Sequence, residues 1–392
     1  MAAQVLSGLG WLTWKGTHAM HRIGLRLLLA FSMALAMTGG AQAQLRYRVE
    51  TIGVLGPDNA SSYSWAYGLN NHGSVVGYSY AQDDEVPFRA FAYENDQIRD
   101  PGNMNGFNTT SARAINDRGQ IVGYATNWAT YEDRPFLYDQ GQLKDLNPAP
   151  GTGNAAYAHA INESGQVAGT INGRAYVHDG TQAHFIPFEG EDIGTTIAWA
   201  INDHGVAVGR AEHGFGRSDA FVWDGNSVSY LPAPQGASDS RMDGADINNA
   251  GQILVDANYR AFLYDGGTYQ ALGTLNGMST SAAALNEKGW IVGSSEVGGS
   301  NPSQPFHAFL WRNGRMRDLN DLLDHDAAQR WELHYAMDIN DRGQIVGLGM
   351  TDGLLRGFIA TPVPEAGTWK LLLAGLGGVG AVAWRRRRGP RD

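Results

Sequence analysis

A short phrase that returns seven times constrains this chain of 392 residues more than any other feature. Each copy has an apolar run, then Asn, two variable residues and Gly, then a second apolar run, as in Ile115 to Gly123. The steps between successive Asn residues are 46, 46, 40, 46, 38 and 54. The paired positions are Asn70 and Gly73, Asn116 and Gly119, Asn162 and Gly165, Asn202 and Gly205, Asn248 and Gly251, Asn286 and Gly289, and Asn340 and Gly343. A repeat of this length is typical of folds built from one supersecondary unit used many times.

Each copy predicts a small antiparallel sheet. Asn bonds to its own turn and Gly adopts positive φ without steric cost, so Asn-x-x-Gly is expected to close a β-hairpin. A second phrase, such as Ala90-Phe91, predicts a third strand with its aromatic side chain inward, and a looser phrase, such as Leu143 to Leu146, predicts a fourth. Four short strands in about 45 residues is the period of a β-propeller blade.

The ends of the repeated region predict how the ring closes. Residues 47–55 resemble a fourth-strand phrase with no blade before it, and the last copy stops after Phe358-Ile359 without one. An N-terminal strand that completes the last blade would remove an open sheet edge. We therefore expect an all-β, seven-bladed β-propeller with four-stranded blades over residues 44–362. An open β-solenoid is the alternative, and it would need capping ends instead.

The same phrases resemble a known family. The segments His307-Ala308-Phe309-Leu310-Trp311 and Ala114 to Gly123 are similar to the HAF family of extracellular repeats. The resemblance covers roughly residues 47–360 and implies an extracellular location. Other copies place Arg89, Arg174 or Arg260 before the small residue, so His307 is not a repeated ligand.

The N-terminus predicts export. Arg22 and Arg26 precede the apolar run 27–37, and Ala41-Gln42-Ala43 follows it. This is the pattern of a secretory signal helix, here residues 1–43, cut between Ala43 and Gln44. Met20 is the expected true start. The export machinery and a signal peptidase are the implied partners.

The C-terminus predicts sorting at a membrane. Tryptophans border the apolar stretch from Trp369 to Trp384, and such a helix with Arg beyond one end is typical of a membrane span with its Arg side cytoplasmic. Around it stand Val363, Pro364, Glu365 and Ala366 on one side and Arg385, Arg386, Arg387 and Arg388 on the other. Residues 363–388 thus resemble the bacterial PEP-CTERM sorting signal. The resemblance implies an inner-membrane tether in a Gram-negative-type bacterium, removal of the helix by an exosortase, and release to the cell surface or extracellular matrix. A plain membrane anchor of a periplasmic protein is the alternative, although the stretch is short.

Composition excludes several classes of function. The chain has no cysteine, which excludes disulfides, thiol catalysis and Cys-ligated metal sites. The two ends hold nine basic and two acidic residues, so the body carries 20 basic against 37 acidic residues. A body this acidic repels phosphate backbones, so nucleic acid is not an expected partner.

No catalytic residue, cofactor or metal site is predicted. The turns lack the closely spaced ligand series of calcium loops, and no histidine pair has zinc-site spacing. The fifth copy is the exception to the repeat, because Val255 stands where the other six copies have Gly and Asp243, Asp246 and Asp256 lie nearby. Repeat drift is the simpler interpretation, and an acidic cluster that faces a sugar or a cation is the other.

Insertions between the repeated phrases carry candidate binding residues. The longest insertions are Tyr80–Arg89, Tyr124–Arg134 and Ser294–His307. They carry aromatic side chains suited to sugar rings or protein partners, namely Tyr80, Tyr124, Trp128, Tyr131 and Phe306. We expect a non-enzymatic binding or scaffold module for extracellular polysaccharide or protein. The alternative is a carbohydrate-active propeller enzyme, a glycan hydrolase or lyase, which needs carboxylates from several blades at one mouth. Ala, Gly and Ile dominate the inner strands, which disfavours the enzyme.

Overall fold

The computed structural model describes residues 45–81, 88–146, 155–190, 193–235, 241–298 and 306–363, which belong to one compact unit, Leu45–Val363. The two predicted terminal helices, the cleavage residues Ala41, Ala43 and Gln44, and the sorting residues from Pro364 to Arg388 lie outside the described residues. Within the described ranges, no helix is long and apolar enough to cross a membrane.

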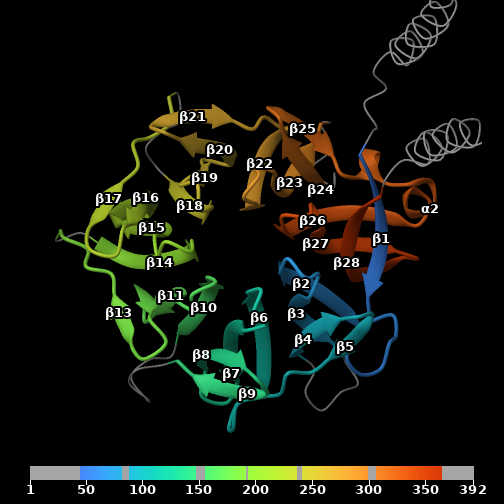
Figure 1. Ribbon diagram of the computed structural model, residues 1–392, viewed down its shortest axis with the longest axis horizontal. Coiled ribbons are helices and arrows are strands. Elements are labelled where there is room, and N and C mark those ends of the chain that lie inside the picture. Colours follow the sequence, from blue (N-terminus) through green and yellow to red (C-terminus); the bar gives the residue numbers. More distant parts are fainter. Residues whose placement is uncertain are drawn as a thin grey trace, which may run out of the picture. The chain divides into compact units, whose positions relative to one another are not determined.

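Seven four-stranded antiparallel sheets stand around a common axis (Figure 1). We number the blades in chain order from the first complete sheet. Blade 1 contains β2 (Tyr63–Leu69), β3 (Val75–Tyr80), β4 (Phe88–Glu94) and β5 (Gln97–Arg99). Blade 2 contains β6 (Thr109–Ile115), β7 (Ile121–Asn127), β8 (Glu132–Asp139) and β9 (Gln142–Asp145). Blade 3 contains β10 (Ala156–Ile161), β11 (Val167–Ile171), β12 (Arg174–His178) and β13 (Ala183–Phe185).

The next three blades repeat the arrangement. Blade 4 contains β14 (Ile193–Ile201), β15 (Ala207–His213), β16 (Arg217–Trp223) and β17 (Val228–Tyr230). Blade 5 contains β18 (Met242–Ile247), β19 (Ile253–Ala257), β20 (Arg260–Asp265) and β21 (Thr268–Ala271). Blade 6 contains β22 (Asn276–Leu285), β23 (Ile291–Val297), β24 (Phe306–Arg312) and β25 (Arg315–Asp318). Short helical turns occur at Gly214–Gly216, Asn320–Leu322 and, as α2, His325–Ala328.

Blade 7 closes the ring with strands from both ends of the repeated region. It contains β26 (Trp331–Ile339), β27 (Ile345–Thr351), β28 (Leu354–Val363) and, as its outer strand, β1 (Arg46–Ile52). β1 runs antiparallel to β28, with Tyr47 opposite Pro362 and Ile52 opposite Gly357. Tyr47 and Ile52 are fully buried. The predicted seven-bladed propeller with an N-terminal closing strand is confirmed.

The core lies between neighbouring blades and is built from the aromatic residue of each third strand. These side chains are at most 9% exposed, and they are Phe91, Phe136, Tyr176, Phe221, Phe262, Phe309 and Phe358. Burying a side chain of this size stabilises the fold by about 1.5–3 kcal/mol. Because each blade supplies one such residue, the sheets are held together around the whole ring.

A β-bulge interrupts the first strand of every blade, three residues before the turn Asn. Next to it the second strand approaches closely, so that a Cβ on Gly77 would lie 1.9 Å from the carbonyl oxygen of Trp65. This explains the Gly of six copies. In the fifth, Val255 pairs with Gly244, whereas the other blades have Ala at the position of Gly244. A Cβ on Gly244 would lie 3.2 Å from Gly209 and 3.3 Å from Val208 of blade 4, so the neighbouring blade, not Val255, limits the space at Gly244.

Candidate functional site

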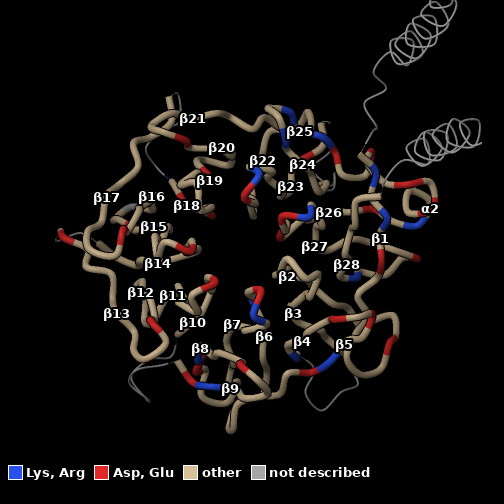
Figure 2. The backbone as a smooth tube through the Cα atoms, in the orientation of Figure 1, with Lys and Arg blue, Asp and Glu red and all other residues tan. Residues whose placement is uncertain are grey.

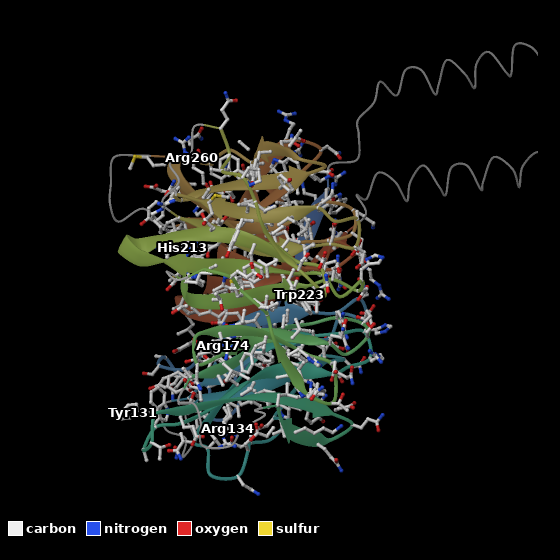
Figure 3. The ribbon with its side chains drawn as sticks, turned by 90° about the vertical axis from the view of Figure 1, so that its left-hand side faces the viewer. Tyr131, Arg134, Arg174, His213, Trp223 and Arg260 are labelled. Carbon is white, nitrogen blue, oxygen red and sulfur yellow. The ribbon has the colours of Figure 1, made fainter. Side chains whose placement is uncertain are left out.

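The strand directions separate two faces of the propeller. The Asn-x-x-Gly turns join the first and second strands at one face, and the loops between the second and third strands lie at the opposite face. Figure 3 views the ring from the side and shows Tyr131, from one of these loops, and His213, at the end of β15, towards one face, with Trp223 farther from it. We call the end of the central axis at the Asn-x-x-Gly turns the turn-side mouth. The opposite end, at the loops between the second and third strands, is the bulge-side mouth.

A ring of seven asparagines surrounds the turn-side mouth. The side-chain Nδ2 of each turn Asn donates to the main-chain oxygen of the turn Asn in the next blade, and Asn340 donates to Asn70 to close the ring. The Oδ1 of each accepts main-chain N–H groups of its own turn, as from Ser164 and Gln166 to Asn162. These asparagines are 3–6% exposed. Each predicted turn residue therefore also joins two blades.

A second ring lies one residue farther along. The main-chain N–H at each of these positions donates to the side chain at the same position of the next blade. The seven residues are Asn71, Asp117, Glu163, Asp203, Asn249, Glu287 and Asp341. Figure 2 shows charged residues at the inner tips of the blades around the axis. Carboxylates from five blades thus meet at one mouth, where they accept main-chain hydrogen bonds.

The bulge-side mouth holds a cavity of about 1260 Å³, which we call the bulge-side cavity. A bulge adds one residue to the strand without a partner on the neighbouring strand. All seven bulged residues line the cavity, and they are Tyr67, Arg113, His159, Trp199, Ala245, Ala283 and Met337. The sequence analysis missed them, because the only signal is their common position three residues before each turn Asn.

Aromatic side chains from neighbouring blades form a continuous wall of this cavity. Trp65 stacks on Tyr67 with ring centroids 5.8 Å apart and lies 5.9 Å from Tyr335. Farther round the ring, Tyr124 and Tyr157 are 4.9 Å apart and edge to face, and His159 and Trp199 are 4.6 Å apart. Phe306 continues the wall beyond Tyr335. Burial, and after it the charge of Arg113, lowers the pKa of His159 to about 3, so its imidazole is neutral at ordinary pH.

Blade 5 places two carboxyl groups on the other side of the cavity. Asp243 on β18 and Asp256 on β19 are directly opposed residues of neighbouring strands, and both line the cavity. Asp256 accepts from Ser281 Oγ at 2.8 Å and from the N–H of Ala282 at 3.2 Å, and Asp243 lies 3.5 Å from Arg210. Burial raises the pKa of Asp256 to about 7 against these hydrogen bonds, and burial likewise raises the pKa of Asp243.

The third acidic residue of the fifth copy has a different place. Asp246 accepts from the N–H groups of Ile247 and of Leu285 in blade 6, and it does not line the cavity. Asp338 of blade 7 likewise accepts hydrogen bonds from the N–H groups of Ile339 and of Leu69 in blade 1. Burial raises the pKa of Asp246 to about 7 and that of Asp338 to about 6. The structure therefore brings Asp243 and Asp256 together and separates Asp246 from them.

The aromatic residues of the insertions divide in the same way. Tyr124 and Phe306 line the bulge-side cavity. Trp128 and Tyr131 are 55% and 74% exposed and do not line it, and Tyr80 packs on Phe88 at 4.7 Å. Within the described residues, no group of three His, Asp or Glu side chains is placed to hold a metal ion.

Two family models match parts of the chain. Residues 362–388 match the PEP-CTERM protein-sorting motif, which confirms the resemblance seen in the sequence. Residues 176–353 match a family described as a protein of unknown function, DUF3466. No curated protein is significantly similar in sequence.

Solved structures resemble this chain only distantly. The extracellular domain of a protein described as a one-component system from B. thetaiotaomicron is 11% identical, with a TM-score of 0.47 over 81% of this chain and 40% of that chain. TolB from Acinetobacter baumannii is 14% identical, with a TM-score of 0.41 over 74% and 80% of the two chains. An acylaminoacyl peptidase from Pyrococcus horikoshii is 13% identical, with a TM-score of 0.39 over 80% and 48%. The chain spans less than half the length of the first and third of these proteins.

The sorting motif carries the functional information in these comparisons. It indicates export and membrane-associated sorting in a Gram-negative bacterium, and it implies processing by exosortase-type machinery. Together with the propeller fold, it indicates an exported surface protein.

Proposed function

We propose that this propeller is a glycan-binding module of the cell surface or exopolysaccharide, and that the bulge-side cavity is its binding site. The observation that carries the proposal is the convergence of all seven bulged residues on one cavity with a continuous aromatic wall. Its volume of about 1260 Å³ exceeds the roughly 300–1000 Å³ of ordinary small-molecule sites, which suits an oligosaccharide.

The chemistry of the cavity matches a sugar. A pyranose ring has apolar C–H faces, which pack on aromatic rings, and hydroxyl groups at its edge, which exchange hydrogen bonds with carboxyl groups and arginine. Trp65, Tyr67 and Trp199 supply the rings, and Asp243 and Arg113 supply polar groups at the same cavity.

We propose the following route of the protein to the cell surface as part of the same function. The repeats are HAF-type extracellular repeats, the hydrophobic segment after Val363 tethers the newly exported chain to the inner membrane, and an exosortase then removes it. The supporting observations are the match over residues 362–388 and the phrase His307-Ala308-Phe309. An open bulge-side cavity on a released propeller is what a matrix-binding protein needs.

A glycan array probed with the full chain tests the binding function, followed by titration of the tightest ligand against Trp199→Ala. Trp199 stands 4.6 Å from His159 in the wall, and loss of its ring is expected to weaken binding about tenfold or more. The matched control is Tyr230→Ala, because Tyr230 is 42% exposed on the outer strand β17 and does not line the cavity. Equal affinities for the two variants would place the ligand elsewhere, and an array without any bound glycan would contradict the proposal.

A second candidate function is a carbohydrate-active enzyme, and the paired Asp243 and Asp256 favour it. A buried carboxyl group with a raised pKa can protonate a leaving oxygen, while an ionised neighbour acts as nucleophile or base. The test is release of new reducing ends from every glycan that the array identifies, with Asp256→Asn and Asp243→Asn as variants. An enzyme predicts release that each variant lowers at least about 100-fold with binding retained. A binding module predicts no release.

A further inference from the structure

Arg113 has an unusual setting in the bulge-side cavity. It is the bulged residue of β6, and its guanidinium lies 4.3 Å from the ring centroid of Tyr67 and 5.3 Å from that of Tyr124. Its Nη2 donates to the hydroxyl of Tyr124 at 3.3 Å. Two aromatic rings therefore fix the orientation of a planar cation at the cavity wall.

No protein carboxylate balances this charge. Among the described residues, none forms an ion pair with Arg113, and its Nε is buried without a hydrogen-bond partner. Its recorded side-chain partners are the hydroxyl groups of Tyr67 and Tyr124, which are neutral, and Arg113 lines the cavity, so a ligand there can reach the guanidinium. A half-buried cation without a counter-ion is costly unless an anion from outside completes it.

The contrast with Arg210 shows that the fold can pair an arginine here. Arg210 also lies beside a wall aromatic, 5.8 Å from Trp199, but its guanidinium meets Glu212 at 2.8 Å and Asp243 at 3.5 Å. The Nε of both arginines is buried without a hydrogen bond, so the difference is that Arg210 has two carboxylate partners and Arg113 has none among the described residues.

We propose that the bulge-side cavity binds a saccharide that carries a carboxylate, and that Arg113 recognises this carboxylate. The proposal rests on the glycan-binding function and names its ligand class. A guanidinium fork fits a carboxylate with two parallel hydrogen bonds. The acidic body, with 20 basic against 37 acidic residues, favours a singly charged group over a phosphate or a dense polyanion.

The position of the acidic pair sets how the saccharide lies. Arg113 belongs to blade 2 and the pair Asp243 and Asp256 to blade 5, so they stand on opposite sides of a ring of seven blades. The ligand carboxylate is therefore held at blade 2, away from the carboxyl groups that would repel it. The hydroxyl groups of the saccharide can donate hydrogen bonds to Asp243 and Asp256 of blade 5, at the other end of the ligand.

Three matched monosaccharides test the proposal by NMR titration of the full chain: methyl β-D-glucuronide, its carboxyl methyl ester and methyl β-D-glucoside. We expect the glucuronide to bind at least about tenfold tighter than the other two, because only it presents a carboxylate. Arg113→Gln should remove this difference, and Arg113→Lys, which keeps the charge without the fork, should retain part of it. Thermal unfolding of both variants checks that they fold.

The possible results distinguish failure of the carboxylate recognition by Arg113 from failure of the glycan-binding function. Equal affinity for all three sugars, with weaker binding by Trp199→Ala, would overturn the role of Arg113 and keep the glycan site. A preference for the glucuronide that survives in a folded Arg113→Gln would also overturn it. Binding of none of the three would overturn the inference, and only an array without any bound glycan would overturn the glycan-binding function as well.

Discussion

The two mouths of the propeller are built from neighbouring positions of the same repeat, yet they differ in almost every chemical respect. At the turn-side mouth the seven turn positions are all Asn, and each forms the same hydrogen bond to the next blade. At the bulge-side mouth, three residues earlier in each copy, the side chains range from Ala to Trp and Arg.

The difference separates structure from function within one repeat. A position that must join two blades is under the same geometric demand seven times, so one residue type serves everywhere. A position whose side chain faces the cavity carries no such demand, and its residues can differ to fit an asymmetric ligand. Satisfied polar groups at one mouth, and at the other Arg113 without an ion pair among the described residues, agree with this division.

The largest expected effect is on stability, at the turn-side mouth. Asn162→Ala removes a bond of 2.9 Å to Asn202 and two bonds from its own turn, and leaves buried polar groups without partners. We expect the free energy of unfolding to fall by about 3 kcal/mol, measured by urea denaturation of the full chain. The control is Ser164→Ala in the same turn, where the side chain is exposed and the change should stay within about 0.5 kcal/mol. A loss below about 1 kcal/mol for Asn162→Ala would mean that the asparagine ring does not hold the blades together.

The same division explains what the sequence could predict. The turn positions Asn70 and Gly73 and their six counterparts are visible because the residue types repeat, and from them the blade, the period and the ring follow. The closing strand was predictable because residues 47–55 match a phrase that the last copy lacks.

The bulge-side cavity could not be predicted from the same signals. Tyr67, Arg113, His159 and Trp199 share no residue type, so no repeated residue marks their common position in the sequence. The lining residues Ala155, Tyr157 and His159 follow ordinary strand alternation, and which face of each first strand meets the cavity depends on how the seven blades are arranged. The pairing of Val255 with Gly244 was likewise hidden, because it needs the cross-strand register.

A smaller effect, on the pH dependence of stability, sharpens the contrast from the cavity side. The pKa of Asp256 is about 7 in the folded protein and 3.8 in its ordinary state, so the folded state binds more protons between these values. This contribution to stability is present at low pH and is lost as the pH rises through about 7. Asp256→Asn should therefore reduce the gain in unfolding free energy between pH 8 and pH 5 by about 2.5 kcal/mol.

Asp246 and Asp338 are present in both the variant and the wild-type protein. Their contributions to the pH dependence of stability therefore cancel when the two proteins are compared. The control is Asp352→Asn, at an exposed position, which should leave the gain unchanged. If Asp256→Asn showed the same pH dependence as the wild-type protein, Asp256 would be an ordinary surface carboxylate, and the polar side of the cavity would lose its distinct character.

The smallest expected effect lies at the rim of the bulge-side face. Trp128 comes from one of the insertions, whose aromatic residues suit sugar rings or protein partners; it is 55% exposed and does not line the cavity. Single exposed aromatic residues are common on protein surfaces. We therefore expect Trp128→Ala to change the affinity for the array-identified glycan less than about twofold, against about tenfold for Trp199→Ala in the wall. An equal loss in both variants would extend the binding surface from the bulged positions to the insertions, because the ligand would then reach across the rim. The order of the two effects thus decides whether the inner strands or the loops carry recognition in this propeller.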